Sequence, residues 1–236
     1  LVAGGILTLR ARSRYLCRNQ PYAKGAVDSL VGNIIGDGII PQALDSAGAQ
    51  TAKNLNSLWV DWGDENACDA DGMLDFYGLQ SLAMRTIAES GSVLIRRRWR
   101  RKSDGLPVPM QIQLLEPDYL DSSRDRILPN GGKILQGVEY DARGLRVAYW
   151  LFPQHPGDRI QVIQGFQSTR IPASEIIHVF RVDRIGQVDG VPWSAPCIIR
   201  MKDLDEYEDA QLIRQKIAAC FVAFVHDIEP IEDLST

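Results

Sequence analysis

Residues 73–100 read MLDFYGLQSLAMRTIAESGSVLIRRRWR, and this stretch decides the fold class. Phe76, Leu79, Ala83 and Ile87 recur at steps of three and four residues, which predicts a helix from Met73 to about Ser90. A glycine at position 91 ends that helix, and an apolar, β-branched run then begins a strand. The chain therefore changes from helix to strand at this point.

The part before this stretch is predicted to be helical. Residues 10–35 have apolar side chains at helical spacing, and Asn19 is a good cap for a turn that contains Pro21. Gly36-Asp37-Gly38 and then Pro41 end the helix. Residues 42–56 are small and polar, and they predict either an exposed connection or a short helix.

The part after it is predicted to be rich in β-strands. The turn Asp141–Gly144 ends in glycine and joins two β-type runs, which predicts a hairpin. A corner at residues 171–175 precedes the last strand. The predicted strands cover residues 93–100, 110–115, 134–140, 145–152, 160–163 and 176–182.

A long helix is predicted from Trp193 or Ser194 into Val225. Its apolar residues follow the helical period and are expected to form a stripe that must be buried, and the other side is acidic. The stripe consists of Met201, Leu204, Tyr207, Ala210, Ile213, Ile217, Cys220, Phe221 and Phe224. Helices, then strands, then a helix predict an α+β fold rather than a doubly wound sheet.

Composition excludes several classes of protein. The 236 residues are 45% hydrophobic and carry a formal net charge of −4, which is ordinary for a globular protein and disfavours a dedicated nucleic-acid clamp. The longest apolar run, residues 217–225, is about half a membrane span, so a soluble protein is expected.

The chain begins at Leu1 and stops at Thr236 in a polar segment, and we therefore expect it to be a piece of a longer protein. The scattered cysteines are expected to be free thiols of a reducing cytoplasm: Cys17, Cys68, Cys197 and Cys220.

An acidic turn at residues 68–75 begins like a calcium loop. Its glycine, Gly72, comes two positions too early for an EF-hand, and Gln80 stands where a bidentate glutamate is needed. We therefore interpret these acidic residues as structural: they would stabilise the turn and the N-terminus of the following helix. The alternative is a metal-dependent nuclease or phosphotransferase that uses Asp69, Asp71 and Asp75.

Charged residues gather in blocks of opposite sign, which suits a subunit that meets copies of itself, although solvated faces give the same pattern. A basic run lies at the end of a strand, so alternate side chains face opposite ways and cannot form one surface. We interpret this run as a solvated hairpin tip or a contact between subunits. The alternative is a contact with DNA in which Trp99 lies between the charged residues. The candidate contact residues are Arg96, Arg97, Arg98, Arg100, Arg101 and Lys102.

The acidic side of the last helix is the second candidate surface, through Asp203, Glu206 and Asp209. The basic stretches at residues 10–18 and 96–102 are its expected complements on a neighbouring copy.

No catalytic, cofactor or metal site is predicted. His155, His178 and His226 stand in unlike contexts, and no phosphate-binding loop or nucleophile motif occurs. The sequence thus predicts a protein that is not an enzyme and needs no cofactor.

An ordered set of local motifs resembles the lambda type of tailed-phage portal proteins across nearly the whole chain. The motifs include residues 22–27 with 32–39, 59–62, 114–118, 137–141, 171–180, 184–187, 190–193 and 204–210. The resemblance implies a wing-like portal region with helical residues 1–92, β-rich residues 93–192, and a helix at 193–236 that leads towards the stem.

The resemblance also implies a function and partners. Portal subunits form a ring, here expected to be a dodecamer, that makes the DNA channel at the capsid vertex for packaging and ejection. The implied partners are double-stranded DNA, the terminase large subunit, capsid and scaffold proteins and head-completion proteins, without a membrane. The implied location is the virion, and the host cytoplasm during assembly. A capsid-associated adaptor without a channel is a further alternative.

Overall fold

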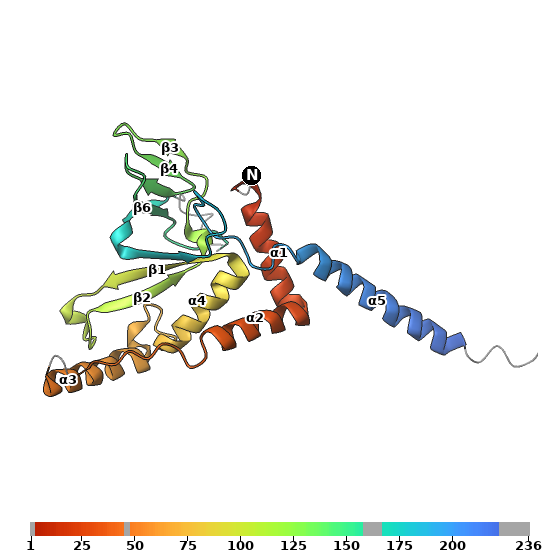
Figure 1. Ribbon diagram of the computed structural model, residues 1–236, viewed down its shortest axis with the longest axis horizontal. Coiled ribbons are helices and arrows are strands. Elements are labelled where there is room, and N and C mark those ends of the chain that lie inside the picture. The colour runs from red at the N-terminus through yellow and green to blue at the C-terminus, as the bar shows by residue number, and fades with distance from the viewer. Residues whose placement is uncertain (1–2, 45–47, 158–166, 222–236) are drawn as a thin grey trace, which may run out of the picture. The chain divides into compact units, whose positions relative to one another are not determined.

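The computed structural model describes residues 3–44, 48–157 and 167–221 (Figure 1). The chain divides into two compact units, Leu1–Pro196 and Cys197–Thr236. The first contains the N-terminal helices and both β-sheets, and the second contains the C-terminal helix. The predicted α+β class is confirmed.

The N-terminal helical segment is two helices rather than the single one predicted for residues 10–35. Helix α1 is Ile6–Asn19 and helix α2 is Pro21–Ile34. Between them Gln20 is extended, and its side chain accepts the N–H of Ala23 at 2.7 Å. Pro21 has no N–H to continue the hydrogen-bond ladder of α1, so the chain restarts there. The predicted cap Asn19 was wrong, because its amide donates to Tyr15 O within α1.

Two further helices follow. The short helix expected as one alternative for residues 42–56 is α3, Ala49–Trp59, which continues into the π-helical turn Val60–Asp64 and the 3-10 turn Asn66–Cys68. Helix α4, Phe76–Ser90, begins three residues later than predicted, because Asp75 caps it by accepting the N–H of Gly78 at 2.6 Å. Gly91, at φ 95°, ends α4 as predicted.

A three-stranded antiparallel sheet follows α4 directly. Its order is β2-β1-β8, with β1 at Ser92–Trp99, β2 at Met110–Leu115 and β8 at Ile176–Phe180. Helix α4 contacts β1 (Figure 1). The strand predicted for residues 176–182 ends two residues earlier, at Phe180.

A five-stranded antiparallel sheet has the order β3-β4-β5-β6-β7. The hairpin across Asp141–Gly144 is confirmed between β5 and β6. The single strand predicted for residues 134–140 was wrong: Gln136 and Gly137 have φ of 50° and 78° and form a two-residue turn between β4 and β5. The strands are Arg126–Ile127, Lys133–Leu135, Val138–Tyr140, Arg146–Leu151 and Thr169–Pro172.

The predicted corner at residues 171–175 contains the end of β7 and a 3-10 turn, Ala173–Glu175. Sequence patterns did not predict β3 and β7, which are only two and four residues long. The strand predicted at residues 160–163 lies outside the described residues. Other 3-10 turns are Ala3–Gly5, Lys102–Asp104 and Pro117–Tyr119.

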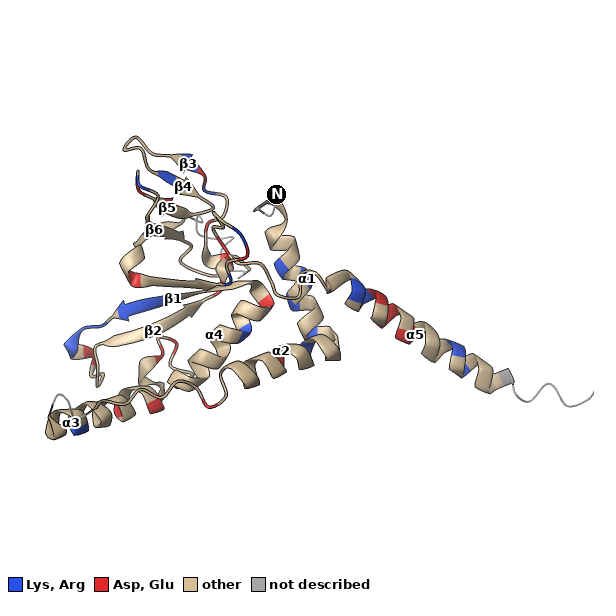
Figure 2. Cartoon of the chain, viewed as in Figure 1, with Lys and Arg blue, Asp and Glu red and all other residues tan. Residues whose placement is uncertain are grey.

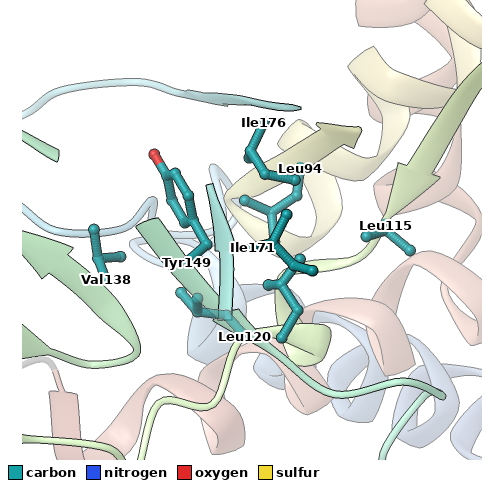
Figure 3. Close-up of a cluster of buried hydrophobic side chains, with 8 residues drawn as sticks. Leu94, Leu115, Leu120, Val138, Tyr149, Ile171 and Ile176 are labelled. Atoms are coloured by element: carbon teal, nitrogen blue, oxygen red, sulfur yellow. The ribbon is translucent and has the colours of Figure 1, made fainter. Parts of the chain in front are cut away.

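The main core joins the two sheets (Figure 3). Leu94 and Leu115 come from the three-stranded sheet, and Val138, Tyr149 and Ile171 come from the five-stranded sheet. Burial of these side chains stabilises each by roughly 1.5–3 kcal/mol relative to exposure. A second cluster, of Cys17, Val27 and Ala88, packs α1 and α2 against α4.

The second unit consists of helix α5, Ile198–Phe221, among its described residues. It begins later than the predicted Trp193 or Ser194, because a residue before proline is restricted from helical conformation and Pro196 follows Ala195. The predicted end at Val225 lies outside the described residues.

The apolar side chains of α5 do not form the predicted stripe. Each step of three residues falls about 60° short of a full turn, so the series Met201, Leu204, Tyr207, Ala210 and Ile213 winds around the helix. The described side chains are largely exposed, among them Tyr207 at 60% and Ile213 at 57%.

Candidate functional site

The basic run lies on β1 and on the tip of the β1–β2 hairpin (Figure 2). The register pairs Leu94 with Leu115, Arg96 with Gln113, and Arg98 with Gln111. Because directly paired residues share a face of the sheet, Arg96 and Arg98 continue the face whose Leu94 enters the main core. Arg97 is on the opposite face, so the predicted division of the run between two faces is present.

Four arginines of the run have partners within the protein. Arg96 forms an ion pair with Glu175 at 3.2 Å, and Arg97 donates to Ser174 O. Arg98 donates to Gln113 and Arg100 to Gln111, at 3.3 and 2.7 Å. These bonds hold the strand side chains in place.

The tip of the hairpin is different. Arg101 and Lys102 are exposed, and neither forms an ion pair within the described part of the chain. Trp99 is 68% exposed beside them. The tip thus combines an exposed aromatic ring with two cations that form no ion pair there, which suits a contact with an acidic partner.

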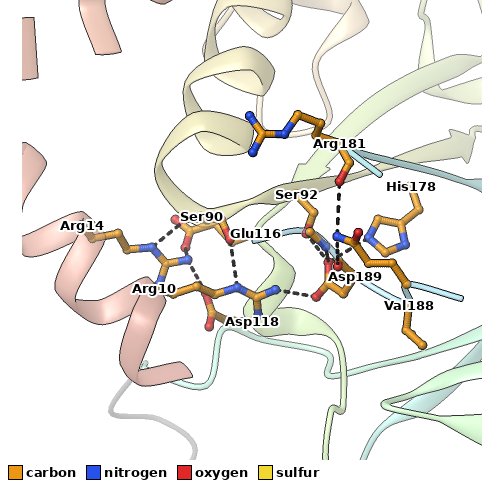
Figure 4. Close-up of polar contacts among 12 residues, drawn as sticks. Arg10, Arg14, Ser90, Ser92, Glu116, Asp118, His178, Arg181, Val188 and Asp189 are labelled. Carbon is orange, nitrogen blue, oxygen red and sulfur yellow. Dashed lines mark hydrogen bonds and ion pairs between the residues drawn. The ribbon is translucent and has the colours of Figure 1, made fainter. Parts of the chain in front are cut away.

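The other basic stretch, residues 10–18, is mostly used inside the protein (Figure 4). Arg10 is buried, donates to Ser90 O at 3.0 Å and pairs with Asp189. Arg14 donates to Ser90 Oγ at 3.0 Å and pairs with Asp118 and, at 2.6 Å, with Glu116. Of the four arginines in this stretch only Arg12 and Arg18 are exposed, so the expected complement to the acidic helix is reduced to these two charges.

Asp189 is the centre of this internal polar network (Figure 4). Its carboxylate accepts from Arg10, from Ser92 Oγ at 2.5 Å and from Gly190 N at 2.7 Å, and it lies 3.2 Å from His178 Nε2. Burial alone would raise the pKa of Asp189, but His178, Arg10 and Ser92 hold that pKa well below its usual range.

The hydrogen bonds of His178 define its tautomer. Arg146 Nη1 lies 3.1 Å from His178 Nδ1. A guanidinium only donates, so Nδ1 accepts and Nε2 carries the hydrogen donated to Asp189. His178 thereby connects Arg146 of β6 to the network around α1, and this is a structural role for a histidine on β8.

Residues 190–194 attach the end of the first unit to α1 and α4. Trp193 N donates to Ala88 O at 3.1 Å, and Ser194 Oγ lies 2.7 Å from Ser13 Oγ. Gly190 lies against Gly91, where a Cβ atom would be 1.9 Å from Gly91 O. This segment is fixed at three points.

The acidic helix is exposed. Asp203, Glu206 and Asp209 all face solvent within the described chain, and their only ion pairs are local, between Asp203 and Arg200 at 3.9 Å and between Glu206 and Lys202 at 3.3 Å. Such exposed pairs within one helix contribute about 0.3–0.5 kcal/mol each, so these carboxylates can accept a partner's cations at little cost.

The acidic turn has the geometry of a structural turn. Asp69 is only 3% exposed, and its carboxylate accepts the N–H groups of Asp71, Met73 and Leu74 at 2.9–3.1 Å. Asp75 caps α4, and Asp71 is exposed. In the described residues Asp69, Asp71 and Asp75 do not converge as a group of metal ligands.

This turn gives a first prediction. Asp69→Ala should lower the free energy of unfolding by about 1–3 kcal/mol, because three backbone N–H groups of the turn lose the buried carboxylate that accepts them. Asp71→Ala, the matched control, should change it by less than about 0.5 kcal/mol. Urea unfolding followed by circular dichroism measures both.

Plasmid DNA incubated with the protein and Mg²⁺ or Mn²⁺ should stay intact, and cleavage that Asp71→Ala abolishes would contradict the structural interpretation.

Sequence reasoning missed a group formed by Glu116, Asp118 and His155, whose possible ligand atoms lie within 4.8 Å of one another. Glu116 and Asp118 belong to one quoted motif, but nothing local places His155 beside them. Arg14 pairs with both carboxylates, and it supplies the positive charge that a metal ion would otherwise bring. The geometry therefore supports an ion-pair group.

No catalytic nucleophile emerges from the buried cysteines. Burial raises the pKa of the Cys17 and Cys68 thiols to about 11, so both are thiols rather than thiolates at neutral pH.

The chain matches a known protein family along nearly its whole length. A family model described as "Phage portal protein, lambda family" matches residues 1–235. The chain belongs to this family. Among curated proteins, the "Probable portal protein" of Halomonas phage phiHAP-1 is 30% identical over 225 residues, which cover 92% of this chain and 42% of that protein. The chain thus spans about two fifths of the length of this relative, and the resemblance seen in the sequence is confirmed.

Lambda-family portal proteins are structural proteins of the phage. Across its described residues, none of the helices is both long enough and apolar enough to cross a bilayer. The tip of the basic hairpin and the acidic side of α5 are both exposed, charged surfaces of the described residues.

Proposed function

We propose that this portal chain is part of a subunit that forms a closed ring, a dodecamer, at one vertex of the phage capsid. The ring is the channel for DNA packaging and ejection, and it docks the terminase large subunit, capsid and scaffold proteins, and head-completion proteins. The subunit is not an enzyme, needs no cofactor or membrane, and belongs to the virion after assembly in the host cytoplasm. The observation that carries the proposal is the family match along residues 1–235.

Within that ring, residues 1–92 and 93–192 would form helical and β-rich parts of the wing, and residues 193–236 would lead towards the stem. Electron microscopy of the full-length protein tests the proposal. Rings with a central hole are expected. Monomers at all concentrations, or assemblies without a hole, would contradict it and favour an adaptor.

Contacts between subunits are proposed to include charge pairing between the basic run at residues 96–102 and the acidic side of α5. Reversing Glu206 and Asp209 to lysine should reduce ring formation of the full-length protein in light scattering, and high salt should have the same effect on the unmodified protein. Each exposed pair contributes only about 0–1 kcal/mol, but the contribution recurs at every interface of a ring.

A matched control carries the same change of net charge elsewhere. Asp64→Lys with Glu65→Lys reverses two exposed acids of the first unit and should leave assembly unchanged. Normal assembly of the α5 variant at all salt concentrations would show that its acidic side is merely solvated.

DNA binding is expected to be weak, independent of sequence and steeply salt-dependent. Phosphate contacts by Arg101 and Lys102 would release counterions, and their replacement by glutamine should lower the slope of log affinity against log salt by about 1–2. Fluorescence anisotropy with duplexes of different sequence measures both properties. Binding that survives high salt or selects one sequence would oppose a purely electrostatic contact.

A further inference from the structure

A hollow of about 320 Å³ lies between the two sheets. Arg96 and Arg98 of β1 and Gln113 of β2 form one wall, and the rest is mainly apolar and aromatic, including Tyr119, Leu151 and Ile171. Two guanidinium groups therefore share a partly buried site with an apolar floor.

The hollow has more positive than negative charge. None of its described lining residues is acidic, and the nearest counter-charge, Glu175, pairs with Arg96 from outside the lining. Burial, followed by the charges of Arg96 and Arg100, lowers the pKa of Arg98. The arginines are thus held together against their mutual repulsion.

The hydrogen-bonding capacity of the two arginines is also incompletely used. Arg96 Nε is buried and has no partner in the described structure, and the guanidinium of Arg98 bonds to Gln113 alone. A guanidinium has five N–H donors arranged to match a carboxylate. The internal bonds of Arg96 and Arg98 therefore leave N–H donors of both groups available to an acceptor that enters the hollow.

We propose that this hollow binds a carboxylate side chain from the acidic segment of a second copy of this chain, residues 203–209. The carboxylate would bond to the forks of Arg96 and Arg98, and its aliphatic stem would contact the apolar floor. This inference rests on the proposed ring and names the site on the neighbouring subunit that receives α5.

Size and charge favour a protein carboxylate over DNA. Phosphates lie on the outside of a duplex that is far wider than a hollow of this volume, and an apolar floor offers them no contact. Residues 203–209 supply five carboxylates within seven residues: Asp203, Asp205, Glu206, Glu208 and Asp209. An exposed acidic segment and a partly buried cationic hollow on one chain are the complementary patches that a head-to-tail ring requires.

Binding of a synthetic peptide tests the inference. The probe is residues 200–212 of this chain with blocked ends, titrated into the 236-residue protein by fluorescence anisotropy at moderate salt. Arg98→Gln should weaken binding about tenfold, since charge-assisted bonds are lost. Arg101→Gln, which removes the same charge from the hairpin tip, should weaken it less than about twofold. A peptide with amides in place of its five carboxylates should not bind.

Three controls keep the result decisive. Arg98→Lys keeps the charge without the fork and should bind with intermediate affinity, and circular dichroism should show that each variant is folded. Equal losses in Arg98→Gln and Arg101→Gln would overturn the inference in favour of diffuse attraction. A 20-base-pair duplex that displaces the peptide and depends equally on Arg98 would overturn it in favour of phosphate. Rings of the full-length protein without peptide binding would refute the hollow alone and leave the proposed function standing.

Discussion

Asp189→Asn should lower the free energy of unfolding by about 3–5 kcal/mol, because it leaves the positive charge of Arg10 buried without its partner. The side chains of Arg10 and Asp189 are only 2% and 10% exposed, and the carboxylate also orders Ser92, His178 and the backbone of Gly190. Asparagine has nearly the same shape, so the loss reports charge and hydrogen bonding rather than volume. Urea unfolding at neutral pH measures it.

A control lies in the same segment. Asp183 is exposed and pairs with Arg181 at 2.7 Å, and Asp183→Asn should change stability by less than about 1 kcal/mol. Similar losses in both variants would show that the network around Asp189 contributes no more than a surface ion pair.

The effect of Asp189 should depend on pH. Since the folded protein holds the pKa of Asp189 below its unfolded value, the carboxylate stabilises the fold fully above about pH 4. That contribution is lost as pH falls through the folded pKa. The stability difference between the unmodified protein and Asp189→Asn should therefore be constant near neutrality and shrink in acid. A difference that grows as pH falls would contradict the sign of the shift.

Gly190→Ala should be nearly as damaging, with an expected loss of about 3 kcal/mol or more. The added Cβ would lie 1.9 Å from Gly91 O and 2.5 Å from Gly91 C, and backbone cannot move aside as the end of a side chain can. Thermal unfolding should show a large decrease in Tm. A change below about 1 kcal/mol would mean that the two backbones are not in close contact.

Replacement of glycine by alanine should have the opposite effect on stability at Gly25. This glycine lies inside α2, and nothing lies within 4 Å of an added Cβ. Gly25→Ala should stabilise the protein by about 0.5–1 kcal/mol through helix propensity. The pair of variants separates steric conflict from the loss of glycine itself.

The elements that sequence patterns predicted well have local causes. The end of α4 follows from Gly91, and the β5–β6 hairpin follows from the turn at Asp141–Gly144. The errors have local causes too: the chain is extended at Gln20, which divides the helix predicted for residues 10–35 in two, and Gln136 adopts a positive φ beside Gly137. Strands of two to four residues are too short to show a periodic pattern.

The charged residues were harder to interpret. A run of arginines looks the same in sequence whether its members bind a partner or hold the fold. Arg10 meets Asp189 across 179 positions of sequence, and Arg14 meets Asp118 across 104. No local pattern reveals such contacts, so the division of each basic stretch into internal and exposed members required the structure.

The segment at residues 190–194 has a mechanical consequence. It is the last attached segment of the first unit before the chain continues into α5, so any tension on that helix enters the first unit there. Along the chain, that tension reaches Ser194 and its contact with Ser13 of α1 first, then Trp193 on Ala88 of α4, and then Gly190 beside Gly91. A pull on α5 would thus load the helices α1 and α4 before it reaches the strands.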